Sequence, residues 1–264
     1  MNILQEIAAR TKERIEAQKK LLPREKIMEI INPDAANSFP FEEALNSDDI
    51  AFICEIKKAS PSKGIIAKDF PYLDIAKDYE KAGAAAISVL TEPYYFKGDD
   101  RYLSEIAGKV SIPLLRKDFT VDSYMIYEAK LLGASAVLLI CALLNEDILK
   151  EYIAIADSLG LSALVETHNE EEVDMALGAG ARIIGVNNRD LKTFEIDMTL
   201  SERLKKIVPS DKLFVSESGI TSPEDIERLR KSGVNAVLIG ETIMRSSDKK
   251  FEILRLRGDG YGKG

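Results

Sequence analysis

The amino-acid sequence predicts a (β/α)₈ barrel, because strand-like and helix-like segments alternate along most of its 264 residues. Three observations carry this prediction. Apolar runs of strand length recur eight times, amphipathic segments of helix length separate them, and several runs follow a glycine. The runs are continuous, as is typical of parallel strands buried on both faces. A doubly wound open sheet is the alternative, but the chain has no Gly-rich dinucleotide or P-loop motif to favour it.

Eight strands are expected. Five share a pattern in which a helix ends at Gly, which supplies the left-handed backbone of a helix C-cap, and an apolar run follows. These five segments are 81–90, 131–140, 159–166, 178–187 and 231–240. Three further runs lack the glycine but match in kind, at 50–57, 111–117 and 212–218.

Helical patterns follow the strands. They cover 71–82, 99–108, 122–132, 146–158, 169–179, 199–206, 222–231 and 248–256. Two helix starts are legible: Ser222 precedes Pro223 and an acidic residue, and Asn145 precedes two acidic residues. Both are N-cap arrangements.

The segments outside the barrel are interpreted next. We expect one domain, with the barrel at 50–257 and a helical extension at 1–49 that packs on it and has helices at 2–20 and 40–47. The charged residues of 1–29 are interpreted as a solvated helix surface. The Gly-rich tail, 258–264, is expected to be disordered.

Composition excludes several classes of function. With 36 Lys and Arg against 44 Asp and Glu, the chain carries a formal charge of −8, which disfavours nucleic-acid binding. One His and two distant Cys cannot form a zinc ribbon, a His-rich metal site or a disulfide framework. No secretory signal is expected, and the longest apolar stretch is too short for a bilayer. We therefore expect a cytoplasmic protein with no metal, cofactor, membrane or obligatory protein partner.

Strand parity predicts a polar site at one end of the barrel. In the first strand Glu55 and Lys57 share the inward face with Ile53, because the apolar residues between them must pack against helices. The same parity brings Lys117, Glu166, Asn187, Arg189 and Glu217 to the carboxyl-end rim. A single polar residue at a strand end is most simply explained by exposure to solvent. Here, however, five strands place polar residues at the same rim.

This rim predicts acid–base chemistry. Neighbouring lysines that are partly desolvated are expected to lower each other's pKa, whereas a Glu beside a Lys stays ionised, so Lys acts as acid and Glu as base. Lys57, Lys63, Lys117 and Arg189 are expected to make the mouth locally positive despite the net charge of the chain.

The loops suggest an anion site. Ser60–Gly64 follows the first strand, and Ser216–Gly219 and Ile239–Gly240 occupy the strand 7 and 8 positions where barrels commonly bind phosphate. Residues 241–244 are expected to form a short extra helix with its N–H groups facing the anion. Two ordinary tight turns are the alternative.

Aromatic residues and the lone histidine are less informative. Tyr94, Tyr95 and Phe96 follow the second strand, and Phe119 lies two residues after Lys117. They either pack loops or stack on a flat substrate ring. His168 is interpreted as a surface or helix-start residue rather than a catalyst.

Seven motifs, in order, occur at strand ends. They are CEIKKASPSKG (54–64), LTEPYYFKG (90–98), PLLRKDF (113–119), LVETH (164–168), GVNNRDL (185–191), SESGI (216–220) and LIGE (238–241). With them the chain resembles the indole-3-glycerol-phosphate synthase family over essentially its whole length. Related phosphate-binding barrels share the last two motifs but not EIKKASPSKG with RKDF.

The resemblance implies a carboxy-lyase of tryptophan biosynthesis that closes the ring of 1-(2-carboxyphenylamino)-1-deoxyribulose 5-phosphate, releasing CO₂ and water. It implies that Lys117 is the general acid and Glu166 the general base. It implies that Lys57 holds the substrate carboxylate and protonates the departing hydroxyl. Supporting roles fall to Glu55, Glu217 and Asn187. The implied phosphate site is Ser60, Arg189, Ser218, Gly219, Gly240 and the amide of Glu241, and the rings flanking the substrate ring are Phe96 and Phe119.

Two other functions remain open at this point. A Schiff-base aldolase acting on a sugar phosphate would use Lys57 or Lys117 as its amine. A sugar-phosphate-binding barrel without catalysis would act as a scaffold or sensor, because a fold alone hosts many functions. It would need a degraded rim, whereas every polar position of the family pattern is filled here.

Overall fold

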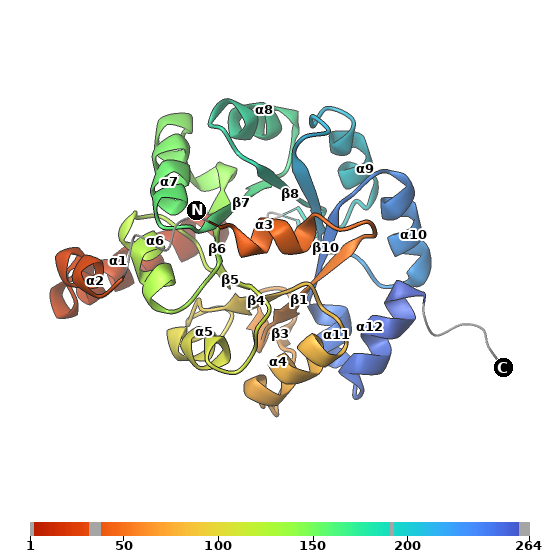
Figure 1. Cartoon of the computed structure of the whole chain (residues 1–264), viewed down its shortest axis with the longest axis horizontal. Coiled ribbons are helices and arrows are strands. Elements are labelled where there is room, and N and C mark those ends of the chain that lie inside the picture. The colour runs from red at the N-terminus through yellow and green to blue at the C-terminus, as the bar shows by residue number, and fades with distance from the viewer. Residues whose placement is uncertain (1–2, 32–37, 191–192, 259–264) are drawn as a thin grey trace.

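The computed structural model describes residues 3–31, 38–190 and 193–258, and within these ranges eight parallel strands close into a barrel (Figure 1). The strands are β1 (Ala51–Ile56), β4 (Ala86–Leu90), β5 (Leu114–Lys117), β6 (Ala136–Ile140), β7 (Ser162–Thr167), β8 (Ile183–Asn187), β9 (Leu213–Glu217) and β10 (Ala236–Ile239). Each pairs with the next around the barrel, and β10 closes against β1. The predicted (β/α)₈ class is confirmed.

Helices follow each barrel strand and surround the barrel in Figure 1. They are α4 (Tyr72–Lys81), α5 (Asp100–Ala107), α6 (Tyr124–Leu131), α7 (Glu146–Ser158), α8 (Glu170–Gly178), α9 (Thr199–Lys205), α10 (Pro223–Lys231) and α12 (Lys249–Arg257). The predicted caps are confirmed: Ser222 accepts the N–H of Asp225 in a capping box, and Asn145 accepts that of Ile148. The predicted capping glycines have φ between 66° and 90°, at Gly83, Gly133, Gly160, Gly180 and Gly233.

Some short elements escaped the sequence prediction. A two-stranded antiparallel hairpin, β2 (Ala59–Ser60) with β3 (Gly64–Ile65), lies in the loop after β1, and α2 (Arg24–Ile30) precedes the barrel. Such pieces span too few residues to show a periodic pattern. A 3₁₀ turn, η2 (Cys141–Leu143), follows β6, and the expected extra helix after β10 is present as α11 (Glu241–Arg245).

Two of the helices that precede the barrel reach its opposite ends. In Figure 1, α3 (Pro40–Leu45) crosses the barrel opening, and its Phe41 and Leu45 are fully buried with the interior residues of the barrel. Its Glu42 accepts hydrogen bonds from Ser162 and Arg182, at the start of β7 and just before β8, so α3 closes the amino end. The helix α1 (Ile3–Leu21) reaches the opposite end, where its first turn lines a cavity.

Alternation along the strands separates two apolar layers, as parity predicts. Ile53 and Leu115 belong to the interior cluster, whereas Phe52, Cys54 and Ile56 pack against the surrounding helices. Both cysteines are buried and unpaired. None of the described helices is long and apolar enough to cross a membrane. Of the tail, only Gly258 is described, as the C-cap of α12, so the prediction for 259–264 falls outside the described residues.

Candidate active site

A cavity of about 450 Å³ opens at the carboxyl ends of the barrel strands. The fourteen residues that the family resemblance assigned to the site all line it, although they come from seven of the eight strand ends and their loops. They are Glu55, Lys57, Ser60, Phe96, Lys117, Phe119, Glu166, Asn187, Arg189, Glu217, Ser218, Gly219, Gly240 and Glu241.

Lys117 lies at the centre of the polar cluster, at the end of β5. Its Nζ is 3.0 Å from Oε2 of Glu166 on β7 and 3.2 Å from Oε2 of Glu217 on β9, two strands that are separated by β8 in the barrel wall. The Asn187 amide donates to the other oxygen of Glu166 at 3.3 Å. The two carboxylates are almost fully buried, so they interact strongly with the ammonium group.

These contacts correct one expectation. Burial alone lowers the pKa of Lys117, but the charges of Glu166, Glu217 and Glu55 outweigh burial and raise it above the usual range. The prediction that lysines lower each other's pKa is therefore wrong for Lys117, because its neighbours are carboxylates. Glu166 keeps its expected charge: burial raises its pKa, but Lys117 and His168 lower it well below the ordinary value.

Glu217 departs from that pattern. Burial raises its pKa to about 7, with the nearby charges of Glu166 and Glu55 adding to the effect and Lys117 opposing it. Its Oε1 is buried without a hydrogen-bond partner among the described residues. The carboxylate fits because β8 has Gly185 beside it; a Cβ there would lie 2.5 Å from Oε1.

A second ion pair lies on the first strand. The Lys57 ammonium contacts the carboxylate of Glu55, and the pair packs against the backbone of Gly240 at the end of β10. A Cβ at Gly240 would collide with Glu55 and would lie 3.0 Å from the Lys57 Nζ. With the pair in this position, a side chain at residue 240 would require the Glu55 carboxylate to shift.

The loops after β8, β9 and β10 form one side of the cavity. Ser218 and Gly219 have φ of 68° and 85°, and such a value is uncommon for a serine. The N-terminal residues of α11 line the same side. The Arg189 guanidinium donates to the carbonyl of Phe194 at 3.2 Å, and this hydrogen bond holds the Arg189 side chain against the loop after β8.

The charge of the mouth also differs from expectation. Among the described residues, the cavity is lined by five cations and five carboxyl groups, so it is balanced rather than positive. The cations are Lys57, Lys63, Lys117, Arg189 and Arg245, and the carboxyl groups are Glu55, Asp118, Glu166, Glu217 and Glu241. Glu55, Glu166 and Glu217 were expected at this rim, and with Asp118 and Glu241 they offset the charge of the cations.

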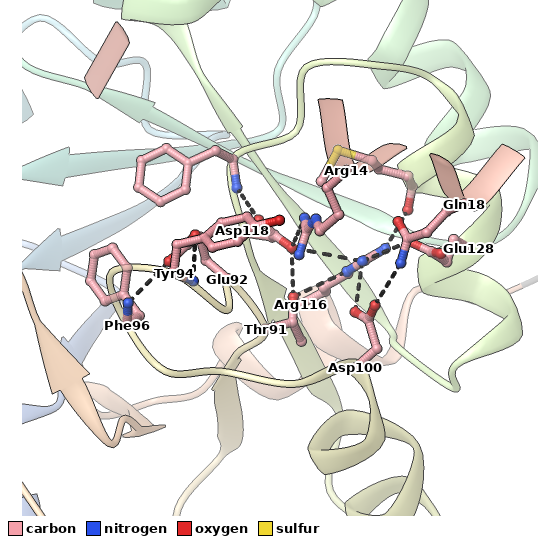
Figure 2. Close-up of polar contacts among 12 residues, drawn as sticks. Arg14, Gln18, Thr91, Glu92, Tyr94, Phe96, Asp100, Arg116, Asp118 and Glu128 are labelled. Carbon is pink, nitrogen blue, oxygen red and sulfur yellow. Dashed lines mark hydrogen bonds and ion pairs between the residues drawn. The ribbon is translucent and has the colours of Figure 1, made fainter. Parts of the chain in front are cut away.

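Phe96 and Phe119 form an apolar wall of the cavity, with ring centroids 5.9 Å apart. Buried carboxylates anchor the backbone of both residues, and Figure 2 shows Glu92 beside Phe96. Glu92 accepts the N–H of Phe96 at 3.0 Å, and Asp118 accepts that of Phe119 at 2.8 Å. The rings contact each other and so present one surface.

Asp118 also ties the site to the N-terminal helix. Its Oδ2 accepts hydrogen bonds from Arg14 of α1 at 2.7 Å and from Thr91 at 2.8 Å (Figure 2). The Arg14 side chain is 10% exposed, so the interpretation of every charge in 1–29 as solvated surface is wrong at this residue. The helix is thus pinned next to Lys117.

His168 was interpreted as a surface or helix-start residue: it does precede Asn169, the N-cap of α8, but it is not a surface residue. Its side chain is 16% exposed and lies between two carboxylates. Nε2 is 3.4 Å from Oε1 of Glu166, and Nδ1 is 3.0 Å from Oε2 of Glu172 on α8.

Several lining residues escaped the sequence analysis. Ile3, Leu4 and Ile7 of α1 cover part of the mouth, although the sequence indicated only that this helix is amphipathic. Thr221 of the loop after β9 and Thr242 and Arg245 of α11 also line it. Only their places after strands 7 and 8, where barrels bind anions, would have indicated them.

The fold and the site together define an α/β-barrel enzyme whose lysine and glutamate side chains are arranged for acid–base chemistry at the carboxyl ends of the strands. The profile of the indole-3-glycerol phosphate synthase family matches residues 4–256. The chain belongs to this family.

Individual relatives agree. The chain is 59% identical to the indole-3-glycerol phosphate synthase of Ruminiclostridium cellulolyticum over 260 residues, which cover 97% of this chain and 99% of the relative. It is 52% identical to the protein of the same name from Lachnoclostridium phytofermentans, over 97% of this chain and 98% of the relative.

Solved structures support the fold alone. The tryptophan synthase alpha-subunit of Pyrococcus furiosus superimposes with a TM-score of 0.60 at 16% identity, covering 80% of this chain and 98% of that one. The N-acetylmannosamine-6-phosphate 2-epimerase of Clostridium perfringens gives 0.60 at 18% identity, over 74% and 88% of the two chains.

Proposed function

We propose that this protein is an indole-3-glycerol phosphate synthase, a carboxy-lyase of tryptophan biosynthesis. It converts 1-(2-carboxyphenylamino)-1-deoxyribulose 5-phosphate to indole-3-glycerol phosphate, CO₂ and water. The observation that carries the proposal for this chain's own residues is the Lys117 ammonium held between Glu166 and Glu217 in the cavity.

Lys117 supplies the acid. The ring carbon that bears the carboxylate attacks the ribulosyl carbonyl, and the carbonyl oxygen takes up a proton from the ammonium. Because the surrounding carboxylates raise the pKa of Lys117, the group carries its proton at neutral pH and faces the charge developing on that oxygen. Loss of CO₂ returns its electron pair to the ring.

Glu166 supplies the base for the dehydration. The new hydroxyl leaves with a proton from Lys57, and Glu166 accepts the proton that departs as the five-membered ring becomes aromatic. The low pKa of Glu166 keeps the carboxylate ionised and ready for this step. Asn187 donates to Glu166 and orients it, while Glu55 and Glu217 hold the two lysines.

The remaining lining residues bind the substrate. The phosphate takes the side formed by Ser60, Arg189, Ser218, Gly219, Gly240 and the amide of Glu241. Phe96 and Phe119 form the surface against which the aromatic ring lies. Lys57 meets the substrate carboxylate before that group is lost.

We also propose that the chain works as one cytoplasmic domain on a small phosphorylated substrate, with neither nucleic acid nor an obligatory protein partner. The location of the extension supports the single domain, because α3 is buried in the amino end of the barrel and α1 lines the mouth. The protonated state of Lys117 counts against the Schiff-base alternative, which needs a neutral amine.

The test is a continuous assay with purified protein and the carboxyphenylamino substrate. The chain contains no Trp, so the fluorescence of the indole product rises without a protein indole background. Turnover with release of CO₂ is expected. A protein that binds the substrate without forming indole would reject the enzymatic function and favour the sensor alternative, and an adduct trapped by borohydride would favour the aldolase.

A further inference from the structure

His168, the only histidine of the chain, is a largely enclosed titratable group, 16% exposed, that the reaction outlined above does not use. It follows Thr167, the last residue of β7, and its backbone N–H and Nδ1 both face Oε2 of Glu172, at 2.8 and 3.0 Å. Two contacts from one carboxylate oxygen fix the plane of the imidazole ring. Nε2 is then directed at Glu166.

The Nε2 atom of His168 lies near Glu166 but does not form a good hydrogen bond with it. It lies 3.4 Å from Oε1 of Glu166, which is longer than a good hydrogen bond, and it is buried with no hydrogen-bond partner among the described residues. A buried donor without a partner is costly, so its persistence needs an explanation. A small movement of Glu166 toward His168 would satisfy it.

Three donors therefore surround the Glu166 carboxylate. Lys117 faces Oε2, while Asn187 and His168 face Oε1. Lys117 is shared with the substrate carbonyl during the reaction, so Glu166 loses part of its cationic partner at that stage. His168 is the cation that remains beside it.

The charge on His168 follows from its neighbours. Burial lowers the pKa of the imidazole, but Glu166 and Glu172 outweigh burial and raise it to about 10. The nearby Cys141, whose Sγ contacts the carbonyl of Glu172, is neutral at pH 7 because burial raises the pKa of its thiol to about 12. An imidazolium is thus enclosed by two carboxylates from β7 and α8.

We propose that His168 is a positioning residue for Glu166: held by Glu172, it orients the Glu166 carboxylate and keeps it ionised while Lys117 engages the substrate. This inference rests on the proposed function, in which Glu166 is the general base. His168 acts on Glu166 in two ways that can be separated: a hydrogen bond from Nε2 and a positive charge. Two variants separate them.

The first experiment records kcat and kcat/KM against pH for His168→Gln and His168→Asn. A glutamine amide reaches the position of Nε2 without charge, whereas an asparagine amide reaches only that of Nδ1. We expect the acid limb of kcat/KM to move upward by about one pH unit in both variants, because Glu166 loses a cation. The plateau kcat should stay close to wild type in His168→Gln and fall several-fold in His168→Asn.

Unchanged acid limbs in both variants would overturn the proposal, even if activity fell, because a purely structural histidine changes the amplitude and not the pH profile. Equal plateau kcat values in the two variants would remove the orienting role. Melting temperatures of both variants verify that they are folded.

The second experiment is independent of activity. Because the chain has one histidine, its imidazole C2–H gives one NMR signal whose titration needs no assignment. We expect it to stay protonated above pH 8 and to titrate at lower pH in Glu166→Gln and in Glu172→Gln. Titration near the ordinary value of about 6.5 would overturn the proposal.

The two experiments distinguish failures. If the wild-type protein does not form indole, the proposed function fails, while the NMR titration still decides whether His168 is coupled to Glu166. If wild type forms indole and Glu166→Gln does not, the general base stands and the His168 variants decide the positioning role alone.

Discussion

Two adjacent cations end β5, and they point to opposite sides of the barrel wall. Arg116 faces outward and is 2% exposed; its Nη2 donates to Asp100 at 2.8 Å and to Glu128 at 2.7 Å, as Figure 2 shows. Its other nitrogens donate to Thr91 and to the carbonyl of Met125. Lys117 faces inward and meets only carboxylates on one side and the cavity on the other.

The difference lies in where unsatisfied groups remain. Around Lys117, Glu217 Oε1 and His168 Nε2 have no hydrogen-bond partner in the described part of the chain, and both lie close to the reacting position. Around Arg116, the atoms without partners are at the edge of the network, on Arg14 and Gln18 of α1. A buried charge cluster that satisfies its central group stabilises the fold, whereas one that leaves it facing a cavity is available for chemistry. Four predictions test this contrast.

The largest effect is expected at Lys117. Lys117→Ala should lower turnover by about 10²–10⁴-fold, because the general acid is lost, while substrate binding remains measurable by calorimetry. The variant also leaves the buried carboxylates of Glu166 and Glu217 without their cation, so its kcat is measured under conditions where it is shown to be folded. An unchanged kcat would end the assignment of Lys117 as acid.

The next effect is expected at Arg116 and concerns stability. Arg116→Met leaves the buried Glu128 and the partly buried Asp100 without their cation, and removing one partner of a buried ion pair costs about 3–5 kcal/mol. Urea unfolding measures the loss. Under conditions where Arg116→Met is folded, its kcat should match that of wild type. A loss of kcat without a loss of stability would show that Arg116 acts in the reaction and not in the stability of the fold.

Asp118 lies between the two clusters and should show a smaller, mixed effect. Asp118→Asn weakens the contact with Arg14 and the anchor of the Phe119 N–H, costing about 1–3 kcal/mol of stability. A several-fold rise in KM should accompany it, because Phe119 forms the wall of the cavity. Arg14→Met is the control: it should reproduce the stability loss without the change in KM if the Phe119 anchor is the cause.

The smallest effect is a pH dependence at Glu217. Its pKa is raised to about 7 in the folded state, so between the ordinary value and pH 7 the folded state binds more protons than the unfolded state. Stability should therefore fall as pH rises from about 4.5 to 7 and level off above that range. In Glu217→Gln the stability should depend less on pH over this range than in wild type. The measurement is Tm of both proteins at several pH values. If the difference between the two Tm values is the same at every pH, Glu217 has an ordinary pKa.

Strand parity predicted much of the site. Glu55 and Lys57 could be placed at the rim from the residues between them, because alternation along a strand is a local property. The pairing of Lys117 with carboxylates could not, since its partners lie on other strands and their distances depend on the closure of the barrel. The pKa expectation failed for that reason.

The two misinterpreted charges have a related cause. Arg14 contacts Asp118 across 104 positions of sequence, and no local pattern marks that contact. His168 is near Glu166 in sequence, but its burial depends on how α8 packs against the loop that precedes it.

The sequence by itself determined the barrel, its eight strands and the inward face of each, because hydrophobic periodicity, helix caps and glycine positions act over a few residues. Only the tertiary structure decided which charges are partners, which carboxylate is protonated near neutral pH and which cations are structural. Those properties depend on distances and burial between segments far apart in the chain. Electrostatic energies in a buried site change steeply with both.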